Sequence, residues 1–365
     1  MTALLDATLK HLRALVGFDT RNPPRAIGTG GIFDYLRANL PGFDCSLTDH
    51  GAGAVSLLAI RGKPKLLFNV HLDTVPDSPH WSASPFELRV DDTRANGLGA
   101  CDIKGAVAAL LAAAQASAGD AAFLFTTDEE GADPRCIRAF LQGTPKFDAV
   151  IVGEPTKCEA VLAHRGISSV LIRFAGRAGH ASGAQGASDN ALHQAVHWSH
   201  RALGHVESLA HEHFDGLAGL RFNIGRIEGG IKPNVIAPSA ELRFGMRPLP
   251  SMDVDDLLAR LRSFAEVQPA EFAETFRGPA LPAGDTAHAE ARRLAARDVA
   301  DALDIPIGNA VDFWTEAALF SQAGYTALVY GPGDIAQAHT ADEWVALEQL
   351  DSAARTYRRL LEKTA

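Results

Sequence analysis

The sequence predicts an α/β fold, in which a mainly parallel sheet is combined with an inserted α+β domain of the ferredoxin-like type. Three observations lead to this fold. Short apolar runs bounded by Gly, Pro and Asp have the character of buried strands. Over residues 1–165 these runs alternate with helical patterns, which indicates a parallel sheet covered on both faces. Over residues 166–276 the order becomes strand–helix–strand, strand–helix–strand, the split βαβ pattern of a small separate domain.

The elements expected in residues 1–165 follow from the spacing of apolar residues. Helical spacing, or a run rich in alanine, predicts helices at Leu5–Leu15, Gly31–Leu40, Lys104–Ala116 and Cys136–Gln142. Short, nearly uninterrupted apolar runs predict strands at Val55–Arg61, Leu66–Val70, Ala122–Thr126 and Ala149–Val152. Strands so uniformly apolar are expected to be buried on both faces.

The remaining residues are expected to form an insert and then a return to the first domain. In residues 166–276 we expect, in order, strand Ser169–Phe174, a turn at Gly176–Ala187, helix Asn190–Leu203, strands Leu220–Glu228 and Ala240–Met246, and helix Val254–Phe264. In residues 277–365 we expect helix His288–Leu303, strand Ala327–Tyr330 and helix Leu347–Lys363. The chain is therefore predicted to form one domain from residues 1–165 and 277–365, interrupted by an inserted domain at residues 166–276.

Composition and charge argue against several classes of protein. The formal net charge is −10 and no basic run occurs, so nucleic-acid binding is not expected. The four cysteines lie far apart, which argues against both a disulfide framework and a thiolate zinc site. The first sixteen residues lack the pattern of a signal peptide, and the longest nearly uncharged run, Gly105–Gly119, is too short to span a bilayer. We expect a cytoplasmic protein without a membrane partner.

Four apolar runs lead into residues that can bind a metal ion or act as a general base. The segments are HLDT (71–74), TTDEEG (126–131), GEPT (153–156) and GPG (331–333), the last followed by His339. In open α/β sheets, sites assemble at the carboxyl ends of strands, so ligands far apart in sequence can meet in one crevice. A single acidic pair is usually a solvated surface. Four such segments at strand ends predict a metal-dependent hydrolase.

The spacing of these residues indicates how they can share the chemistry. His71 and Asp73 lie two apart, so both side chains can point the same way, and a carboxylate can orient a metal-bound imidazole. Asp102 follows a loop with two glycines, which lets the backbone come close to an ion. The adjacent Glu129 and Glu130 point in opposite directions on extended chain, so one can bind metal while the other serves as the base.

With Glu154 and His339, these side chains form a mixed set of nitrogen and oxygen donors. Such donors suit zinc, with cobalt or manganese as substitutes. Two metals bridged by one carboxylate need about five ligands, and the number present fits. The sequence has no Gly-x-Ser-x-Gly elbow, no His-Glu-x-x-His helix and no phosphate loop. We therefore expect two divalent metal ions and a small-molecule substrate.

Seven segments resemble one metallopeptidase family, in the right order and across nearly the whole chain. They are HLDT (71–74), GLGACDIKG (97–105), TTDEEG (126–131), GEPT (153–156), GHAS (179–182), GGIKPNVI (229–236) and GPGDIAQAH (331–339). The family comprises acetylornithine deacetylase, succinyl-diaminopimelate desuccinylase, aminoacylase and glutamate carboxypeptidase. The resemblance implies a catalytic domain of the zinc-peptidase type. It also implies that residues 166–276 form a lid or dimerisation domain, and hence a homodimer.

The resemblance implies a role for each residue of the centre. The five metal ligands would be His71 and Glu154 on one zinc, Glu130 and His339 on the other, and Asp102 between them. Glu129 would be the general base, and Asp73 would orient His71. Glu129 would take a proton from the attacking water and return it to the leaving amine.

Three residues of the lid also acquire roles through the resemblance. His180 would reach the partner subunit's active site and help to stabilise the oxyanion. Asn234 and Arg247 match lid positions that contact polar groups of the substrate. The chain departs from the family at Leu98, where a polar residue is usual, and at Gly245, where an acidic one is usual. The electrostatics of the substrate pocket are therefore expected to differ within the family.

The predicted function is removal of a small acyl group from the α-amine of an amino acid. The segment 331–339 with Asp342 and Glu343 is most similar to acetylornithine deacetylases, and the whole chain is similar to the branch that deacetylates N-acetylcitrulline in arginine biosynthesis. One alternative is an exopeptidase of the same fold that cuts a dipeptide or an acyl-glutamate. Another is a metal- or ligand-binding protein that has lost catalysis, against which the intact Glu129 argues.

Overall fold

The computed structural model describes residues 2–24, 27–131, 133–143, 146–183, 186 and 189–363, and it divides into two compact units. The first unit contains Met1–Leu162, Arg292–Gly308 and Thr315–Ala365, and the second contains Ala163–Ala291 and Asn309–Trp314. The second unit therefore extends beyond residue 276, the end expected from the sequence. Of the turn expected at Gly176–Ala187, residues 184, 185 and 187 lie outside the described part of the chain.

A small apolar cluster accounts for the extension of the second unit. Ala289 packs with Phe214, Leu217 and Leu249, which all belong to the insert. Ala163, just before the expected boundary at 166, belongs to the same cluster. These apolar contacts join the first residues of the helix that contains Ala289 to the second unit. Such contacts cannot be read from the spacing of apolar residues in the sequence.

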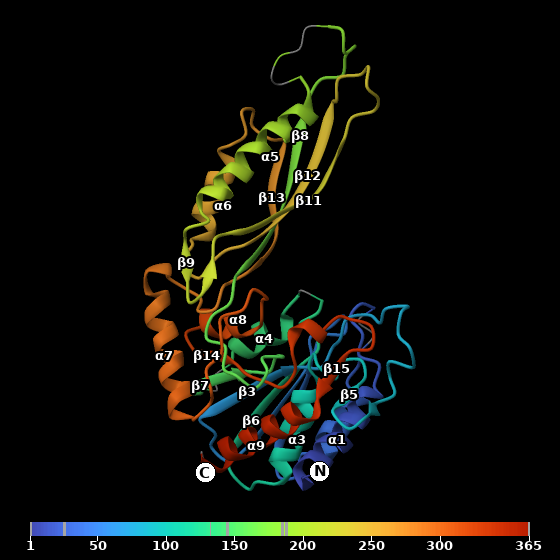
Figure 1. Cartoon of the computed structure of the whole chain (residues 1–365), viewed down its shortest axis with the longest axis vertical. Coiled ribbons are helices and arrows are strands. Elements are labelled where there is room, and N and C mark those ends of the chain that lie inside the picture. Colours follow the sequence, from blue (N-terminus) through green and yellow to red (C-terminus); the bar gives the residue numbers. More distant parts are fainter. Residues whose placement is uncertain are drawn as a thin grey trace. The chain divides into compact units, whose positions relative to one another are not determined.

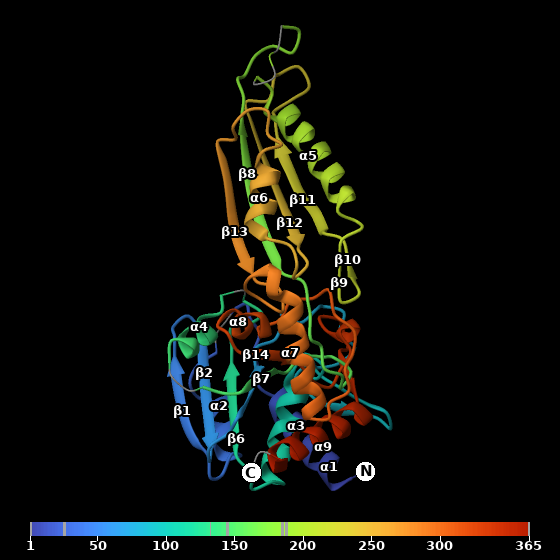
Figure 2. The same ribbon diagram turned by 90° about the vertical axis from the view of Figure 1, so that its left-hand side faces the viewer.

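The first unit is built on a six-stranded sheet in the order β1-β2-β6-β3-β7-β14 (Figures 1 and 2). The strands are β1 (Asp44–Asp49), β2 (Val55–Arg61), β3 (Leu66–His71), β6 (Ala121–Thr126), β7 (Ala149–Val152) and β14 (Thr326–Val329). Neighbours β6, β3, β7 and β14 run parallel, while β1 and β2 form an antiparallel edge. The structure thus has the mainly parallel sheet that the sequence predicts.

Helices cover both faces of this sheet, which explains why its central strands are buried and mostly apolar. On one side α1 (Ala3–Val16), α3 (Lys104–Gln115) and α9 (Leu347–Lys363) pack on one another (Figure 1). On the other side lie α4 (Arg135–Leu141) and α8 (Ala317–Gln322). Every residue of β3, β6 and β7 is buried. The unit also contains α2 (Ile32–Ala38) and most of α7 (Ala289–Ala302).

The second unit is a four-stranded antiparallel sheet in the order β11-β12-β8-β13. Its strands are β8 (Ile167–Ala175), β11 (Arg221–Gly229), β12 (Ser239–Arg247) and β13 (Glu271–Gly278), and its long helices are α5 (Ala191–Ser208) and α6 (Val254–Arg262). Trp198 of α5, Leu261 of α6 and Phe244 of β12 belong to one apolar core. The strand–helix–strand repeat and this strand order are those of the ferredoxin-like split βαβ fold.

Several short elements were not expected from the sequence. They are β4 (Arg89–Val90), β5 (Arg94–Asn96), β9 (His213–Phe214), β10 (Leu217–Ala218), β15 (Trp344–Ala346), and the 3-10 turns η1 (Thr286–His288) and η2 (Ile335–Gln337). The edge strands β1 and β13 and the short helix α8 were not expected either. Both edge strands are largely exposed or half-buried, so neither carries the continuous apolar run that marks a central strand. Among the described residues, no helix is long and apolar enough to cross a membrane.

Candidate metal centre

The predicted ligands of the first unit come from the carboxyl ends of neighbouring parallel strands. His71 is the last residue of β3, Glu130 follows the end of β6 at Thr126, and Glu154 follows the end of β7 at Val152. Asp102 enters from the loop just before α3. Because β6, β3 and β7 are adjacent, the chain segments that leave them meet at one edge of the sheet.

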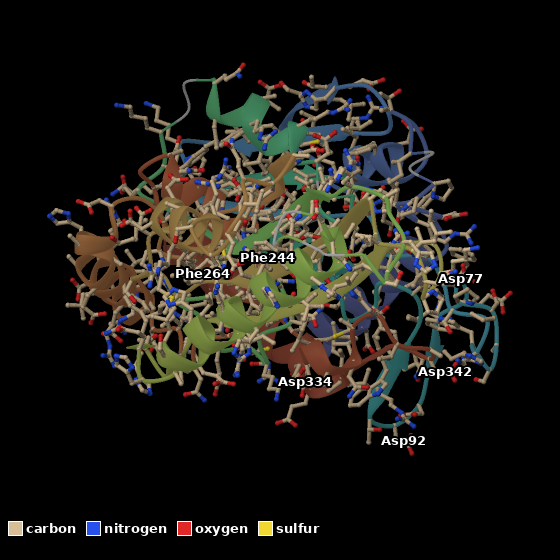
Figure 3. All side chains as sticks on the ribbon, turned by 90° about the horizontal axis from the view of Figure 1, so that it is seen from above. Asp77, Asp92, Phe244, Phe264, Asp334 and Asp342 are labelled. Carbon is tan, nitrogen blue, oxygen red and sulfur yellow. The ribbon has the colours of Figure 1, made fainter. Side chains whose placement is uncertain are left out.

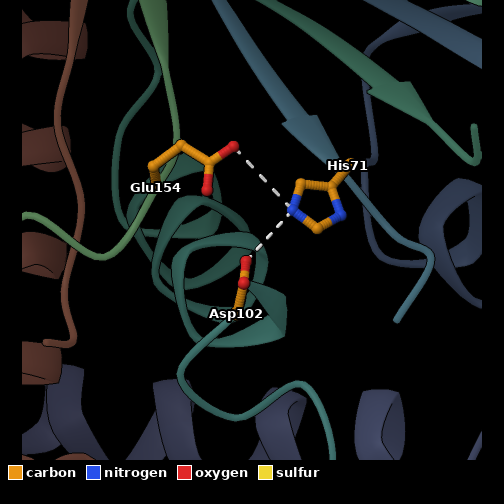
Figure 4. A group of neighbouring side chains, drawn as sticks. All are labelled: His71, Asp102 and Glu154. Atoms are coloured by element: carbon orange, nitrogen blue, oxygen red, sulfur yellow. Dashed lines mark hydrogen bonds and ion pairs between the residues drawn. The ribbon is translucent and has the colours of Figure 1, made fainter. Parts of the chain in front are cut away.

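A first group of ligands consists of His71, Asp102 and Glu154, all buried (Figure 4). Nε2 of His71 lies 3.2 Å from Oδ1 of Asp102 and 3.9 Å from Oε1 of Glu154. Figure 4 shows the imidazole at the tip of its strand, facing the carboxylates of Asp102, just before α3, and of Glu154, in the loop after β7. One nitrogen and two oxygens therefore converge on one point, as the ligands of a single ion do.

A second group consists of Asp102, Glu130 and His339. Nε2 of His339 lies 3.1 Å from Oε1 of Glu130 and 3.3 Å from Oδ2 of Asp102. Asp102 thus presents Oδ1 to the first group and Oδ2 to the second. This is the geometry that a bridging carboxylate needs. His339 has a positive φ of 59°, and its side chain is half exposed, so the second group is the more open of the two.

The donor set fits a pair of divalent cations. Two imidazoles and three carboxylates surround two adjacent points, and zinc, cobalt and manganese accept such mixed sets. Burial opposes the charged form of Asp102, yet hydrogen bonds from His339 and His71 outweigh it and hold its pKa low. Burial, with Asp102 and Glu129 nearby, raises the pKa of Glu154 well above its usual range. Bound cations would favour the ionised form of such crowded acids.

Glu129 carries the marks of a proton-transfer group. Burial raises its pKa to about 8, with Glu130, Asp102 and Asp73 adding to the rise while His71 opposes it. A general base works best when its pKa lies near the working pH. Cations bound at the neighbouring groups would bring this pKa down toward neutrality.

Asp73 differs in detail from the role expected of it. Nδ1 of His71 makes its 2.9 Å hydrogen bond with the main-chain oxygen of Asp73, whereas the carboxylate Oδ1 lies 3.5 Å away. The other carboxylate oxygen, Oδ2, accepts from Nδ2 of Asn22 at 2.9 Å and from the main-chain N–H of Glu130 at 3.0 Å. Asp73 therefore contacts His71 through its backbone and the Glu130 segment through its side chain.

Two further buried carboxyl groups near the centre were not singled out from the sequence. Thr126 donates through Oγ1 to Oε2 of Glu316 at 3.3 Å, and the main-chain N–H of Cys136 donates to Oδ2 of Asp128. Oε1 of Glu316 and Oδ1 of Asp128 have no hydrogen-bond partner among the described residues. Burial, with Asp128 and Glu129 nearby, raises the pKa of Glu316 well above its usual range. A lone glutamate at the start of the apolar helix α8 was the signal in the sequence.

The three predicted lid residues occupy two places in the second unit. His180 pairs with Val235, and the main-chain N–H of Ala181 donates to the carbonyl of Asn234, so His180 and Asn234 lie on adjoining segments. Nδ1 of His180 lies 2.6 Å from Oγ of Ser182. Arg247 is the last residue of β12. The first residue of this strand, Ser239, lies at the other end, where it pairs with the last residue of β8. Burial lowers the pKa of Arg247.

The family model of "Peptidase family M20/M25/M40" matches residues 67–363. The chain belongs to this family. It is 70% identical over 362 residues to the N-acetyl-L-citrulline deacetylase of Xanthomonas campestris pv. campestris, covering 99% of each chain. It is 31% identical over 316 residues to the acetylornithine deacetylase of Salmonella paratyphi B, covering 82% of this chain and 77% of that protein.

Solved structures support the fold. The YXEP protein of Bacillus subtilis, described as a dinuclear metal binding peptidase of the M20 family, has a TM-score of 0.67 at 15% identity, covering 99% of this chain and 98% of that one. A tripeptidase from Staphylococcus aureus has a TM-score of 0.72 at 17% identity, with the same coverage. The predicted family and α/β fold class are confirmed. The predicted enzyme class, a metal-dependent amidohydrolase, is confirmed by the match to this peptidase family and by the similarity to a deacetylase over the full chain.

Proposed function

We propose that the protein hydrolyses the amide of an N-acetyl-L-amino acid to acetate and the free amino acid, as a step in arginine biosynthesis. N-acetyl-L-citrulline is the first candidate substrate and N2-acetyl-L-ornithine the second. The observation that carries the proposal is the 70% identity to a citrulline-type deacetylase, which spans 99% of both chains. Because the substrate would be a biosynthetic intermediate, we also propose that the enzyme works in the cytoplasm.

Two divalent ions, zinc in the first place, would be held by the five ligands of the two groups. The ligands are His71 and Glu154 for one ion, Glu130 and His339 for the other, and Asp102 for both. When bound, such ions lower the pKa of a water molecule to about 7 and polarise the substrate's carbonyl. The contribution of the protein is to fix the ligands at or after the ends of β3, β6 and β7 and in the loops that carry Asp102 and His339.

Glu129 would move the proton. In its ionised form it accepts a proton from the attacking water, and it then delivers that proton to the amine as the C–N bond breaks. Burial raises the pKa of Glu129 to about 8 in the metal-free protein, and bound cations would lower it toward neutrality. The carboxyl can then both accept and release a proton near neutral pH. A neutral amine leaves, and the acetyl carbon keeps the oxygen of the water.

We further propose that the active form is a homodimer joined through the second unit. Val196 and Leu203, on α5, are 56% and 46% exposed, and Ile227 on β11 is 42% exposed. The nine-residue strand β11 is an edge strand that pairs only with β12 in the described part of the chain. Long uncovered edges and apolar patches mark association surfaces.

The two places of the lid residues support a shared active site. His180 and Asn234 lie beyond one end of β12 and Arg247 at the other, so roughly 25–30 Å of strand separates them. One small substrate cannot reach both places at once. A dimer offers a solution in which Arg247 serves one site and the partner subunit's His180 completes it.

The experiment that tests the proposed reaction measures release of free amine from acetyl amino acids by the zinc- or cobalt-loaded protein. N-acetyl-L-citrulline should have the highest kcat/KM, with N2-acetyl-L-ornithine below it, and dipeptides should be poor substrates. Faster cleavage of dipeptides or acyl-glutamates would instead support the exopeptidase. Turnover of none of these substrates by metal-loaded protein would support a binding protein.

A further inference from the structure

Glu343 connects the loop that carries Asp102 to the loop that carries His339. It lies four residues after His339 and is only 2% exposed. Its Oε1 accepts the main-chain N–H of Cys101 at 2.8 Å and that of Asp102 at 2.9 Å. Its Oε2 accepts the main-chain N–H of Gly99 at 2.9 Å. One buried side chain thus binds three backbone donors of a single loop.

The backbone of Glu343 adds a fourth contact to the same loop. Its carbonyl accepts the main-chain N–H of Gly97 at 3.0 Å. Residues 97–102 belong to no helix or strand, and Gly99 has a φ of +78° that a side chain would strain. The other main-chain N–H groups of this loop bond outside the His339 segment: that of Leu98 donates to the carbonyl of Pro85 at 2.8 Å, and that of Ala100 donates to the carbonyl of Gly97 at 3.0 Å. The contacts to Glu343 are therefore its main anchor on the side of the His339 loop.

The position of Asp102 is more demanding than that of any other ligand. Its two oxygens lie 3.2 Å from His71 and 3.3 Å from His339, so its backbone must be fixed in both distance and rotation. Metal ligands work within roughly 0.2 Å of their ideal distances. A shift of the Asp102 N–H by several tenths of an ångström would remove at least one oxygen from its group.

We propose that Glu343 is a positioning residue that holds Asp102 midway between the two metal positions. It touches neither substrate nor metal, and it acts by joining the backbone of the bridging ligand to the segment of a ligand of the second group. Because Asp102 serves both groups, loss of Glu343 weakens both ions together. This inference rests on the proposed metal centre.

Glu343→Gln is the sharpest change, because it keeps the size of the side chain. A glutamine offers only one acceptor oxygen. Its amide NH₂ group would face a loop N–H that has a carboxylate acceptor in the wild-type protein. At least one contact to Gly99, Cys101 or Asp102 would therefore become repulsive. Glu343→Asp is the second variant. It keeps the charge but retracts the carboxylate by one methylene group, so we expect an intermediate effect.

Asp342→Asn is the matched control. Asp342 is the neighbouring acid in the same loop, and it is labelled in Figure 3. Its Oδ1 accepts from the main-chain N–H and Oγ of Ser82 and from Nη2 of Arg89, and its side chain is 37% exposed. Its side chain makes none of the contacts to the Gly99–Asp102 backbone that Glu343 makes. The substitution removes a carboxylate from the same loop. Asparagine tolerates the φ of +56° that Asp342 adopts.

The experiment measures metal affinity by titrating chelator-treated protein with zinc or cobalt against a competing chromophoric chelator. The wild-type protein should bind two ions per chain. Glu343→Gln should weaken both by about 10–100-fold, as loss of a residue that supports a ligand does. Asp342→Asn should change either affinity by no more than about 2-fold. Thermal melting of each metal-free variant reports whether it is folded.

Two results would overturn the inference. Glu343→Gln with wild-type affinity for both ions, even at a lowered melting temperature, would show that Glu343 merely satisfies buried backbone groups. Weakening of one ion alone would show that it does not act through Asp102. Wild-type protein that bound no metal would instead overturn the proposed centre itself, so the two failures are distinguishable.

Discussion

The main-chain N–H of Glu130 donates a 3.0 Å hydrogen bond to Oδ2 of Asp73. The two residues follow the carboxyl ends of the neighbouring parallel strands β6 and β3. This contact ties a predicted ligand of the second group to the segment that carries His71, a ligand of the first. Asp73 is fully buried, and Oδ2 makes the hydrogen bonds of its carboxylate, because Oδ1 has no hydrogen-bond partner among the described residues.

Asp73→Asn should therefore weaken metal binding. Oδ2 accepts two donors, from Asn22 and from Glu130, and an asparagine presents one acceptor and one donor group. We expect zinc affinity to fall by about 10–100-fold in a chelator competition. The control is Asp77→Asn, which removes a carboxylate that pairs with Arg21 and is part-exposed. Equal affinities of the two variants would contradict this role.

Glu129→Gln should leave the metal ions bound but greatly slow hydrolysis of the substrate. Glu129 belongs to neither ligand group, so the loaded protein should keep two ions per chain. Turnover should fall by about 10²–10⁴-fold, as it does when a general base is lost. Metal content is measured on the same sample as the rate. If the variant lost a metal ion as well as its activity, Glu129 would be the ligand and Glu130 the general base.

A mixture of two inactive variants tests whether His180 serves the partner subunit. Glu129→Gln and His180→Ala should each be nearly inactive alone. After subunits exchange at random, about half of the dimers are mixed, and each has one site with both groups, so about a quarter of wild-type activity should return. If His180 acts in its own chain's site, no mixed dimer has a complete site and no activity returns.

Charges placed on the exposed apolar face of α5 should separate the subunits. Val196→Glu with Leu203→Glu should give a monomer in sedimentation velocity, because a glutamate in an apolar interface must lose its hydration. Leu294→Glu is the matched control, since Leu294 is 43% exposed but lies on α7. A double variant that sedimented as the wild type does would place the interface elsewhere.

The stability of the metal-free protein should fall as the pH rises from about 5 to 8. Burial raises the pKa of Glu129 from 4.5 to about 8 and that of Glu343 from 4.5 to about 7. Hydrogen bonds to Asp102 and Glu130 raise the pKa of His339 from 6.5 to about 10. In this window the folded state holds more protons than the unfolded state, so folding becomes less favourable as protons are removed.

Thermal melting at several pH values, with and without zinc, checks this dependence. Without metal the melting temperature should drop across the window. With zinc it should rise above the metal-free value, and by more at higher pH, because the ligands bind the ion in their deprotonated forms. A metal-free melting temperature that stayed constant or increased with pH would contradict the raised pKa values.

The sequence predicted some secondary-structure elements better than others. The buried strands β3, β6 and β7 are mostly apolar, so the sequence located them and also the polar residues at their ends. The edge strands β1 and β13 were not predicted because nearly all of their residues are exposed or half-buried, which leaves no apolar run. Helix α9 begins and ends where its apolar periodicity predicts.

Within the site, ligand types could be predicted and supporting contacts could not. A histidine or carboxylate after a strand is visible in the sequence because metal chemistry requires that residue type. Asn22 and Glu316 contact residues about 50 and 190 positions away, and only the folded chain shows these pairings. The same holds for Glu343, whose contacts are all to backbone groups and therefore leave no signature in the residues they reach.

The first unit is discontinuous in sequence, and this sets an order of assembly during translation. His71, Asp102, Glu130 and Glu154 all precede the second unit, whereas His339 and Glu343 follow it. Domains fold as they emerge from the ribosome, amino end first. A nascent chain can therefore gather these four ligands early but lacks the second imidazole until the second unit has been synthesised. On the proposed assignment of ligands, the hydrolytic centre therefore stays incomplete until the ribosome has also made the inserted unit.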